Sequence, residues 1–418
     1  NNKKNKKEPD YPGIEVKDDY TVVFHFTEAR NDNLQSLMNI SVISSNQFKD
    51  SYAYKKTKPI QDAVGKPIGT GPYVLDKWEA GTGASLKKNE KYWGDDYKGI
   101  ANVIIKPVKM ETEYQELKSG NIDLLAGQIE PKKIGPASNN EDLTINHYPR
   151  GGMGYITYNT VNGATSEKEV RQALSYAFDR QSFVNSYYEC KDCKDLDGVE
   201  IGYVPTTWNN PISKLGKVIT GEEKVDGLTN YNYDIKKAKQ ILDDAGIVDT
   251  DGDGIRELDG QNINLRYISY ENRLLNDFAD AQAQYLAEIG IGVVPEYGSS
   301  DDQWSKLAAL DYDLNNNNWI TVGTGDPLAY MANWATDTSY CAYSNPDYDK
   351  LYEELKGEMD PEKRKDLIFQ MQQILVDDAA VLIDGYYNSS MIYSKKVGSA
   401  HIHTADYYWL STEITPAE

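Results

Sequence analysis

The amino-acid sequence predicts an α/β protein with more than one domain. From about residue 150 onward, segments with apolar residues at helical spacing alternate with short runs of β-prone residues. This alternation is the pattern of an α/β architecture. The chain is 418 residues long, and at about 150 residues per domain it would form roughly two or three domains.

For the first part of the chain, the sequence predicts mainly short strands. The run YTVVFHF at 20–26 is rich in β-branched and aromatic residues, which favour strands. Further strands are expected at 84–88, 102–108 and 122–126, and a helix over 111–119 that ends near Gly120.

The second part of the chain carries marked helix ends. Ser166 and Glu169 have the spacing of a capping box, and Asp360 followed by Pro361 is a typical helix start. Other helices are expected after Asp234, ending at Gly246, and over 274–289, ending at Gly290. The β-prone runs between these helices lie at 263–268, 291–294 and 381–383.

The charge excludes some partners. The formal net charge is -21, whereas nucleic-acid binding requires a basic surface. An anionic membrane surface is equally unsuited to such a chain. No run of about 18 apolar residues occurs that could cross a membrane. The acidity by itself indicates only a soluble protein.

Cysteine and histidine are scarce. The three cysteines are too few for a disulfide scaffold. Cys190 and Cys193 form one C-x-x-C pair without the further ligands that a zinc site needs, so either a small local disulfide or two free thiols is expected. His401 and His403 would share one side of a strand, but two ligands make only a weak metal site.

Tyrosine is unusually common, with 32 tyrosines against 7 phenylalanines. A tyrosine combines a flat apolar ring with a hydrogen-bonding hydroxyl group. Such side chains suit a wet surface that grips a ligand, although half-buried packing would use them as well.

Four motifs occur in a recognisable order. They are GTGPY at 69–73 with NEKYWG at 89–94, VRQALSYAFDR at 170–180 after Asn159, YD at 233–234 with AG at 245–246, and Trp319 followed by GDP at 325–327. Together they resemble the family 5 extracellular solute-binding proteins, which are the dipeptide-, oligopeptide- and nickel-binding proteins of ABC importers. The similarity runs from about residue 14 to the C-terminus.

The resemblance implies a two-lobed, periplasmic-binding-protein-like (type II) α/β fold with a hinge. The expected division is 1–60 as the remnant of a small inserted domain, 61–152 as lobe I, 153–386 as lobe II, and 387–418 as a return to lobe I. The sequence matches the family from roughly a quarter of its length onward. The N-terminal portion, with the signal peptide and lipid-anchor cysteine, is therefore expected to be absent from this sequence.

The resemblance also implies a function. It predicts an extracytoplasmic component of an ABC importer, a cell-surface lipoprotein or periplasmic protein, that captures peptides and delivers them to permease subunits in the membrane. A non-enzymatic protein without a cofactor is expected. The alternatives are a binder of a glycan or another polar solute, for import or for sensing, and an enzyme that hydrolyses glycans. Nickel is disfavoured because histidine is scarce.

Seven residues are candidate ligand contacts. Tyr155 and Tyr158 flank the expected crossing between the lobes, where hinge packing is the alternative role. The other five match pocket positions or could approach a ligand: Asn159, Trp304, Trp319, Gly323 and Asp326. Asp326 before proline could equally be an ordinary turn start.

One departure concerns the ligand. Peptide-binding relatives place an aspartate shortly after the tryptophan, but no acid lies between Trp319 and Asp326. No arginine precedes Trp319 either, where the run 315–318 is four asparagines. These neutral side chains would favour amide or hydroxyl groups over carboxylates.

A loop of alternating aspartates resembles the start of a calcium-binding loop. Asp249, Asp251 and Asp253 have the required spacing, and the Ile255 carbonyl and Glu257 could add ligands. The twelfth position holds glycine, so a complete EF-hand is not formed. A structural Ca²⁺ is therefore one expectation, and an ordinary Asp/Gly turn is the other.

Overall fold

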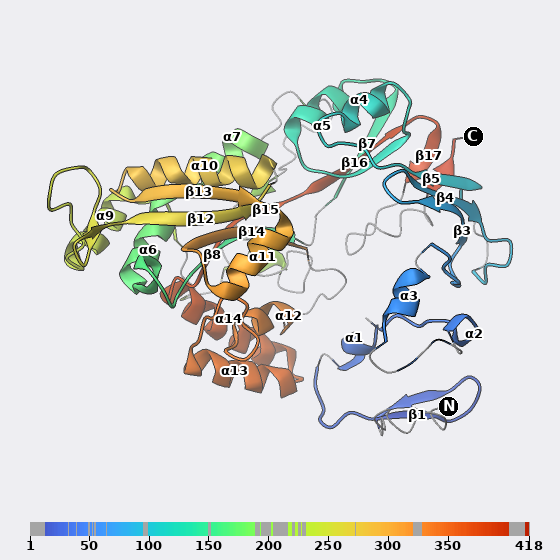
Figure 1. Cartoon of the computed structure of the whole chain (residues 1–418), viewed down its shortest axis with the longest axis horizontal. Coiled ribbons are helices and arrows are strands. Elements are labelled where there is room, and N and C mark those ends of the chain that lie inside the picture. The colour runs from blue at the N-terminus through green and yellow to red at the C-terminus, as the bar shows by residue number, and fades with distance from the viewer. Residues whose placement is uncertain are drawn as a thin grey trace. The chain divides into compact units, whose positions relative to one another are not determined.

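The computed structural model contains two compact units. The structure describes residues 13–31, 33–38, 40–48, 51, 53, 56–63, 65–94, 99–148, 152–188, 193, 202–203, 216–219, 222–224, 227, 231–271, 273–320, 328–400 and 414–417 (Figure 1). Unit 1 comprises Asn1–Leu125, Tyr393–Ile402 and Tyr407–Glu418, and unit 2 comprises Ala126–Ile392 and His403–Asp406. The four-part lobe division expected from the resemblance stays a prediction.

Unit 1 is built from short antiparallel strands and short helices. Its strands are β1 (Ile14–Val16) with β2 (Val22–Phe24), β3 (Tyr73–Glu79) with β4 (Gly83–Lys88) and β5 (Asn102–Ile105), and β17 (Val397–Ala400) with β18 (Ile414–Pro416). Its helices are α1 (Asn33–Met38), α2 (Ser45–Phe48), α3 (Lys58–Asp62) and α4 (Glu113–Lys118). The expected strands at 20–26, 84–88 and 102–108 and the helix at 111–119 are confirmed.

The centre of unit 2 is a mixed six-stranded sheet. Its order is β13 (Gly292–Gly298), β12 (Asn264–Tyr270), β14 (Leu314–Ile320), β8 (Gly152–Tyr158), β15 (Val381–Tyr387) and β9 (Gly202–Tyr203). Strand β12 is parallel to β13 and β14, whereas β8 is antiparallel to β14 and β15. A separate sheet has three strands in the order β6 (Leu124–Gln128), β16 (Ser389–Ser394) and β7 (Leu143–Tyr148).

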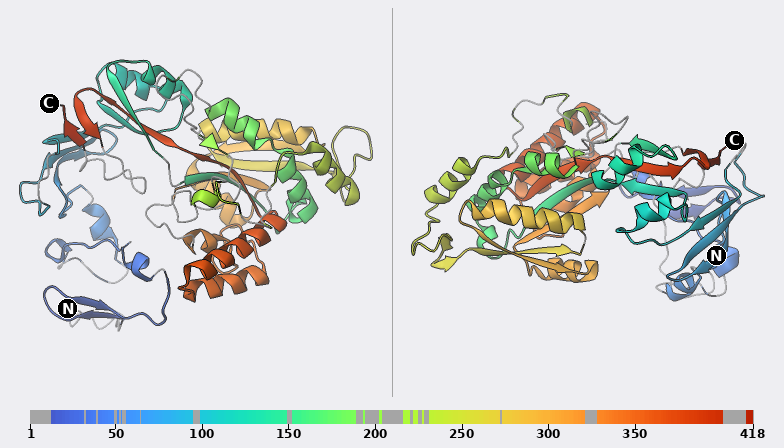
Figure 2. Two further views of the ribbon diagram at one scale, coloured as in Figure 1. Left: turned by 180° about the vertical axis from the view of Figure 1, so that it is seen from behind. Right: turned by 90° about the horizontal axis from the view of Figure 1, so that it is seen from above.

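Helices cover both faces of the six-stranded sheet (Figures 1 and 2). The long ones are α6 (Lys168–Ala177), α7 (Arg180–Tyr188), α9 (Ile235–Asp244), α10 (Arg273–Ala287), α11 (Ser300–Ala309), α13 (Pro346–Gly357) and α14 (Pro361–Asp377). Shorter segments are α5 (Pro131–Ser138), α8 (Gly216–Ile219), α12 (Leu328–Met331) and the hairpin of β10 (Glu257–Leu258) with β11 (Gln261–Asn262). The expected α/β fold class is thereby confirmed.

The predicted helix starts are confirmed in two cases and wrong in one. The Asp234 carboxylate accepts a bond from the Lys237 N–H at the start of α9. Asp360 caps α14 in the same way, with Pro361 in the first turn. Ser166 does not cap α6, which begins at Lys168. Its hydroxyl donates instead to the Gly163 carbonyl within a 3₁₀ turn.

The two faces of the sheet have different partners because side chains alternate along a strand. On β8, Tyr155 and Met153 belong to a buried apolar cluster with residues of α13 and α14. Tyr158 lies on the opposite face, where its hydroxyl contacts Ser175 of α6 at 3.1 Å. Two tyrosines three positions apart on this strand therefore face different layers.

At the exposed edge of this sheet, β12 and β13 are joined by an ion-pair network. Arg266 Nε donates to Glu296 Oε1 at 2.7 Å and Nη2 donates to Oε2 at 3.1 Å, while Lys306 Nζ lies 3.2 Å from Oε2. The Arg266 hydrogen bonds lower the pKa of Glu296 to about 2. In the unfolded chain that pKa returns to its ordinary 4.5.

This network predicts an acid-sensitive contribution to stability. A carboxyl group whose folded pKa is depressed stabilises the protein above its unfolded pKa, and the stabilisation disappears as pH falls toward the folded value. Unit 2 should lose stability between about pH 4.5 and pH 2, and Glu296→Gln should reduce that loss. Urea unfolding at pH 6 and pH 3 measures it, with the exposed Glu169→Gln as control. Equal pH dependence in the wild type and Glu296→Gln would contradict it.

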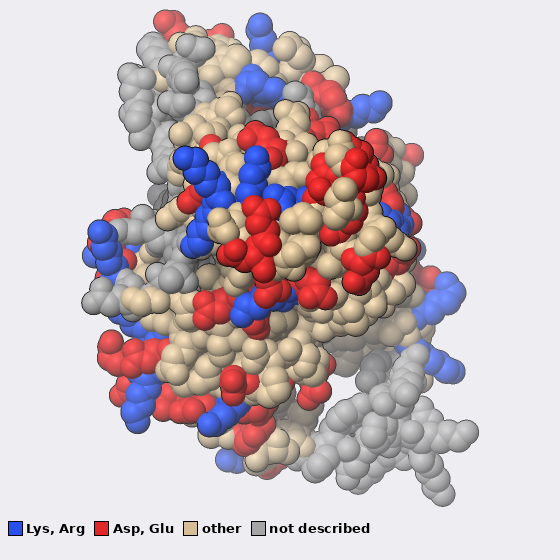
Figure 3. All heavy atoms as spheres, turned by 90° about the vertical axis from the view of Figure 1, so that its left-hand side faces the viewer, with Lys and Arg blue, Asp and Glu red and all other residues tan. Residues whose placement is uncertain are grey.

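The surface agrees with the charge analysis. On the face shown in Figure 3, acidic and basic side chains are interspersed and do not gather into a basic patch. Among the described helices, none has both the length and the apolar composition needed to span a bilayer.

Candidate functional site

An aromatic cluster in unit 2 is the strongest candidate for a binding site. It consists of Tyr155 on β8, Trp304 on α11, Tyr312 before β14, and Tyr340 after the 3₁₀ turn at 332–334. The rings of Trp304 and Tyr340 meet edge to face with centroids 6.0 Å apart. The Tyr155 and Tyr340 hydroxyls are close enough for a hydrogen bond between them to act on the pKa of both. We call these four residues the aromatic cluster.

The cluster extends from the protein interior to solvent. Tyr155 and Tyr312 are buried, with 2% and 3% of their surface exposed, whereas Trp304 is 47% exposed. Tyr340 also contacts the buried Trp334, with ring centroids 6.0 Å apart. Tyr340 contacts one edge of the Trp304 indole. Because Trp304 is nevertheless 47% exposed, a large part of its ring remains available to a ligand.

The groups that act by charge on the three tyrosine hydroxyls of the cluster are neutral ones. Burial raises the pKa of Tyr155, Tyr312 and Tyr340 above the ordinary value for a phenol. The groups that act on these three hydroxyls by charge are other tyrosines and the buried thiol of Cys341. All of these groups are uncharged at neutral pH, so the cluster interacts through hydrogen bonds and ring faces.

A buried chain of polar side chains supports the cluster. Gln303 Nε2 donates to Asn315 Oδ1 at 2.6 Å, and Asn315 Nδ2 donates to Thr157 Oγ1 at 3.2 Å. On the other face, the Ser269 hydroxyl donates to Asn316 Oδ1 at 3.0 Å. These asparagine amides are used inside the protein. The side chains of Asn315 and Asn316 therefore have partners within the protein, while the expected preference for amide or hydroxyl groups stays a prediction.

One buried atom beside this chain, Gln303 Oε1, has no hydrogen-bond partner among the described residues. Buried polar atoms in folded proteins almost always have a partner in protein, water or ligand. The hydroxyls of Tyr312 and Tyr340 are close enough to the hydroxyls of Thr157 and Tyr155 for hydrogen bonding to act on their pKa. Gln303 Oε1 is therefore the atom of this group that leaves a place for an ordered water.

Tyr158 and Asn159 have partners within the protein. Tyr158 is fully buried, and burial raises its pKa to about 12. The Asn159 amide donates to the carbonyls of Leu310 and Tyr312 at 3.1 and 2.8 Å, and its carbonyl accepts two backbone bonds from the following turn. These contacts give both residues a structural role at the end of β8. A ligand role for them remains a prediction that the structure does not test.

The remaining candidates lie in or beside the segment 321–327. The backbone of Trp319 pairs with Met153 at the end of β14, but its side chain lies outside the described residues. Gly323 and Asp326 also lie outside them. The structure thus brings Trp304 close to Tyr155 through Tyr340 and leaves the other three as predictions.

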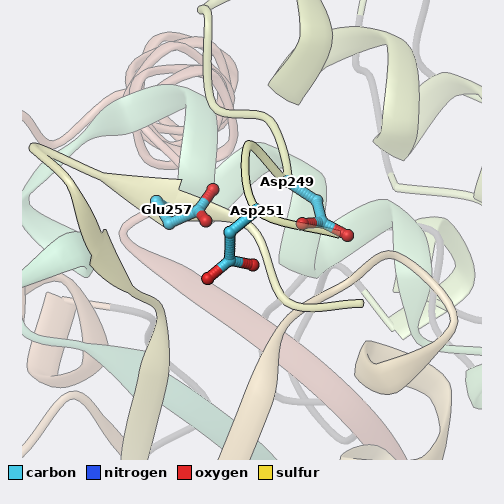
Figure 4. Close-up of side chains that lie close together, drawn as sticks. All are labelled: Asp249, Asp251 and Glu257. Carbon is cyan, nitrogen blue, oxygen red and sulfur yellow. The ribbon is translucent and has the colours of Figure 1, made fainter. Parts of the chain in front are cut away.

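The aspartate loop gathers three of the four carboxylates expected there. Oxygens of Asp249, Asp251 and Glu257 lie within 4.8 Å of one another (Figure 4). Asp253 turns away, accepting bonds from the Ile255 N–H at 2.8 Å and the Asn262 amide at 2.6 Å. Of the four carboxylates expected as possible ligands, the structure gathers these three and leaves out Asp253. Calcium binding itself stays a prediction.

The carboxylates of this loop already accept hydrogen bonds from its own backbone. Asp249 accepts from the N–H groups of Gly252 and Gly254 at 2.7 and 2.9 Å, and Glu257 accepts from Thr250 at 2.8 Å. These bonds are those of an Asp/Gly turn, so the loop can form without an ion.

Of the cysteines, Cys193 is disulfide-bonded and Cys341 is a free, buried thiol. The alternative of two free thiols is therefore wrong for Cys193. Cys190, His401 and His403 lie outside the described residues.

Sequence reasoning missed Gln303, Tyr312 and Tyr340. The alternation along β8 could have placed Thr157, the partner of Asn315, on the same face as Tyr155. Tyr340 comes from an irregular segment, which has no periodic pattern that could have revealed it. Its position depends on how that segment packs.

Comparison with known proteins identifies the family. The family model of the bacterial extracellular solute-binding proteins, family 5 Middle, matches residues 1–341. The oligopeptide-binding protein AppA of Bacillus subtilis is 26% identical over 404 residues, covering 90% of this chain and 67% of the relative. Di/tripeptide-binding protein 3 of Pseudomonas aeruginosa is 26% identical, covering 88% of this chain and 65% of the relative. The chain spans about two thirds of the length of these curated relatives.

Solved structures with the same fold agree. AppA of Bacillus subtilis in complex with a nonapeptide superposes with a TM-score of 0.80 at 22% identity, covering 97% of this chain and 78% of that chain. NikA of Brucella suis in complex with Fe(III)-EDTA gives a TM-score of 0.80 at 21% identity, covering 96% and 78%. The expected two-lobed type II fold is thereby confirmed. This chain belongs to the family 5 bacterial extracellular solute-binding proteins.

Proposed function

We propose that this protein is the extracytoplasmic solute-binding component of an ABC importer, which captures peptides and passes them to permease subunits without altering them. The observation that carries the proposal is the family match over residues 1–341. Relatives with oligopeptide- and di/tripeptide-binding names support peptides as the solute class. Peptides also suit a site made of aromatic rings and neutral hydrogen-bonding groups.

Two features support a location outside the cytoplasm. The family is described as extracellular, and the disulfide at Cys193 is of a kind that persists in oxidising compartments. We propose a cell-surface lipoprotein or a periplasmic protein. Labelling of intact cells with an antibody, compared with permeabilised cells, tests this location.

Peptide capture is tested directly. Native mass spectrometry of the protein mixed with random synthetic nonapeptides identifies bound sequences, and calorimetry with one resynthesised peptide measures its Kd. We expect retained peptides of unchanged mass. Retention of oligosaccharides instead would favour the glycan-binding alternative, and product formation from either class would overturn the non-enzymatic function.

Trp304→Ala should weaken peptide binding by about tenfold to a hundredfold, because exposed tryptophans at binding sites contribute strongly to affinity. The same change should have little effect on folding, since the indole is 47% exposed. Calorimetry of the variant checks the affinity. Tyr233→Ala, which removes an aromatic ring of unit 2 that is 42% exposed, should leave the Kd unchanged. An equal effect of both variants would count against the site.

A further inference from the structure

We propose that unit 2 encloses an ordered water molecule between α6 and α10, held by the side-chain amide of Gln282. This water site lies in the helical layer on the Tyr158 face of the six-stranded sheet, and it does not depend on which solute the protein captures. Three features support it: the complete burial of Gln282, the lack of a partner for both of its amide atoms, and the carbonyl end of α6 opposite it.

Gln282 is a fully buried polar side chain. Its exposed fraction is 0%, and Phe278 and Leu286, one turn before and one turn after it on α10, are buried as well. Neither Oε1 nor Nε2 of Gln282 has a hydrogen-bond partner among the described residues. Whichever way the amide is turned, a donor and an acceptor are both left over. Such an amide would be costly if it stayed dry, and buried polar groups almost always have a partner.

The aromatic contacts of α10 place Gln282 opposite the end of α6. The ring of Phe178, the residue that follows α6, meets the rings of Phe278 and Tyr285 edge to face, with centroids 4.8 and 5.5 Å apart. Residues three and four positions apart are neighbours on a helix surface, so Gln282 lies one turn from each of these two rings. Its amide therefore lies between the two ring contacts and faces the segment in which α6 ends.

The end of α6 supplies hydrogen-bond acceptors. The last four carbonyl groups of an α-helix have no partner within the helix. At this end, the Tyr176 carbonyl accepts a bond from the Asp234 N–H at 2.9 Å, and the neighbouring carbonyls of the last turn are acceptors of the same kind. A carbonyl could accept directly only from Gln282 Nε2, which would leave Oε1 unpaired. A water molecule can donate to Oε1 and to a carbonyl while it accepts from Nε2, which gives the roughly three bonds typical of buried water.

The surroundings favour water over an ion. The side chains on either side of Gln282 are Phe278, Tyr285 and Leu286, none of which carries a charge at neutral pH. A buried ion without a counter-charge would lose its hydration at high cost, and a hard cation such as Ca²⁺ would require six to eight oxygen ligands. Water is the small neutral molecule that offers both a donor and an acceptor to the amide.

A crystal structure of the wild-type protein, at a resolution that shows ordered water, tests the site directly. We expect at least one water molecule within hydrogen-bonding distance of both amide atoms of Gln282, and we expect it to bond to the end of α6 as well. Direct bonds from both amide atoms to protein groups, or an amide without electron density for a water beside it, would overturn the proposal.

Gln282→Met tests the same site through stability. Methionine replaces the amide by an apolar chain of similar length, so a hydrated amide and a dry one give opposite results. Loss of a hydrated amide removes hydrogen bonds, and Tm should fall by about 2–4 °C. A Tm equal to or above that of the wild type, the result expected when an unsatisfied buried amide is removed, would overturn the proposal.

Gln284→Met is the matched control, because Gln284 is exposed on the same helix. This variant makes the same chemical change without removing a buried amide, so its Tm should equal that of the wild type. A crystal structure of Gln282→Met should lack the water that the wild type contains. If Gln282→Met does not fold, the wild-type crystal structure alone decides whether the water is present.

Discussion

Replacing Arg180 with methionine should lower the free energy of unfolding of unit 2 by about 3–5 kcal/mol, the loss typical when a buried charge is left without the opposite charge that acts on it. Arg180 is 4% exposed and Asp384 is 2% exposed. The guanidinium donates to the Ile383 carbonyl at 2.6 Å and also to the Tyr231 carbonyl. Without Arg180, the Asp384 charge remains buried and the two carbonyls lose their donor.

The electrostatics of Arg180 explain why the loss should be large. Burial lowers the pKa of Arg180 to about 10, and the Asp384 charge opposes that shift. Burial thus disfavours the charged guanidinium, and the nearby Asp384 charge favours it. Guanidinium chloride unfolding followed by circular dichroism measures the free energy.

A second substitution separates charge from packing. The double variant Arg180→Met/Asp384→Leu has no Asp384 charge left to bury. It should therefore recover much of the stability lost in Arg180→Met. Arg180→Lys should be intermediate, because lysine keeps the charge but not the forked geometry that reaches two carbonyls. A double variant no more stable than Arg180→Met would show that the unbalanced Asp384 charge is not the cause.

Gly154→Ala should have an effect of similar size on the same part of the sheet. A Cβ atom built at Gly154 would lie 2.0 Å from Asp384 Oδ1 and 2.6 Å from Oδ2. Asp384 follows Ile383 where the register of β15 against β8 shifts, and it is held beside Arg180. Because the carboxylate cannot withdraw without leaving its counter-charge, strain of several kcal/mol is expected.

The thermal midpoint of Gly154→Ala measures this cost, and a large decrease or failure to fold is the expected result. Gly357→Ala is the matched control in the same unit, because nothing lies within 4 Å of a Cβ added at Gly357. Alanine at this helix end should be neutral or mildly stabilising. Equal Tm values for the two variants would contradict the steric explanation.

The sequence by itself predicted the elements that depend on local chemistry. Asp234 and Asp360 cap helices because a short carboxylate reaches the first free N–H groups of its own chain. Gly246 and Gly290 end helices with φ values of +75° and +77°, a conformation that glycine adopts without strain. The Ser166 prediction was wrong because spacing alone does not reveal that a 3₁₀ turn precedes α6.

The candidate site was predictable only in part. The motif series placed Tyr155 and Trp304 in one site, and the structure connects them through Tyr340. The same reasoning grouped Tyr158 with Tyr155, although an odd separation along a strand sends the two rings to opposite faces. Periodicity could have separated them, but only once the strand was known to run through both positions.

The sequence alone determined the fold class, the caps at Asp234 and Asp360 and the family, since these follow from short-range patterns and from the order of motifs along the chain. Only the tertiary structure decided which polar side chains are used internally and which remain unpaired. Three separate elements pack together and so bring together Gln303, Asn315 and Thr157. Likewise, the charge of Asp384 acts on Arg180 although the two residues are about 200 positions apart in the sequence. Burial and pairing depend on those long-range contacts, which no local pattern encodes.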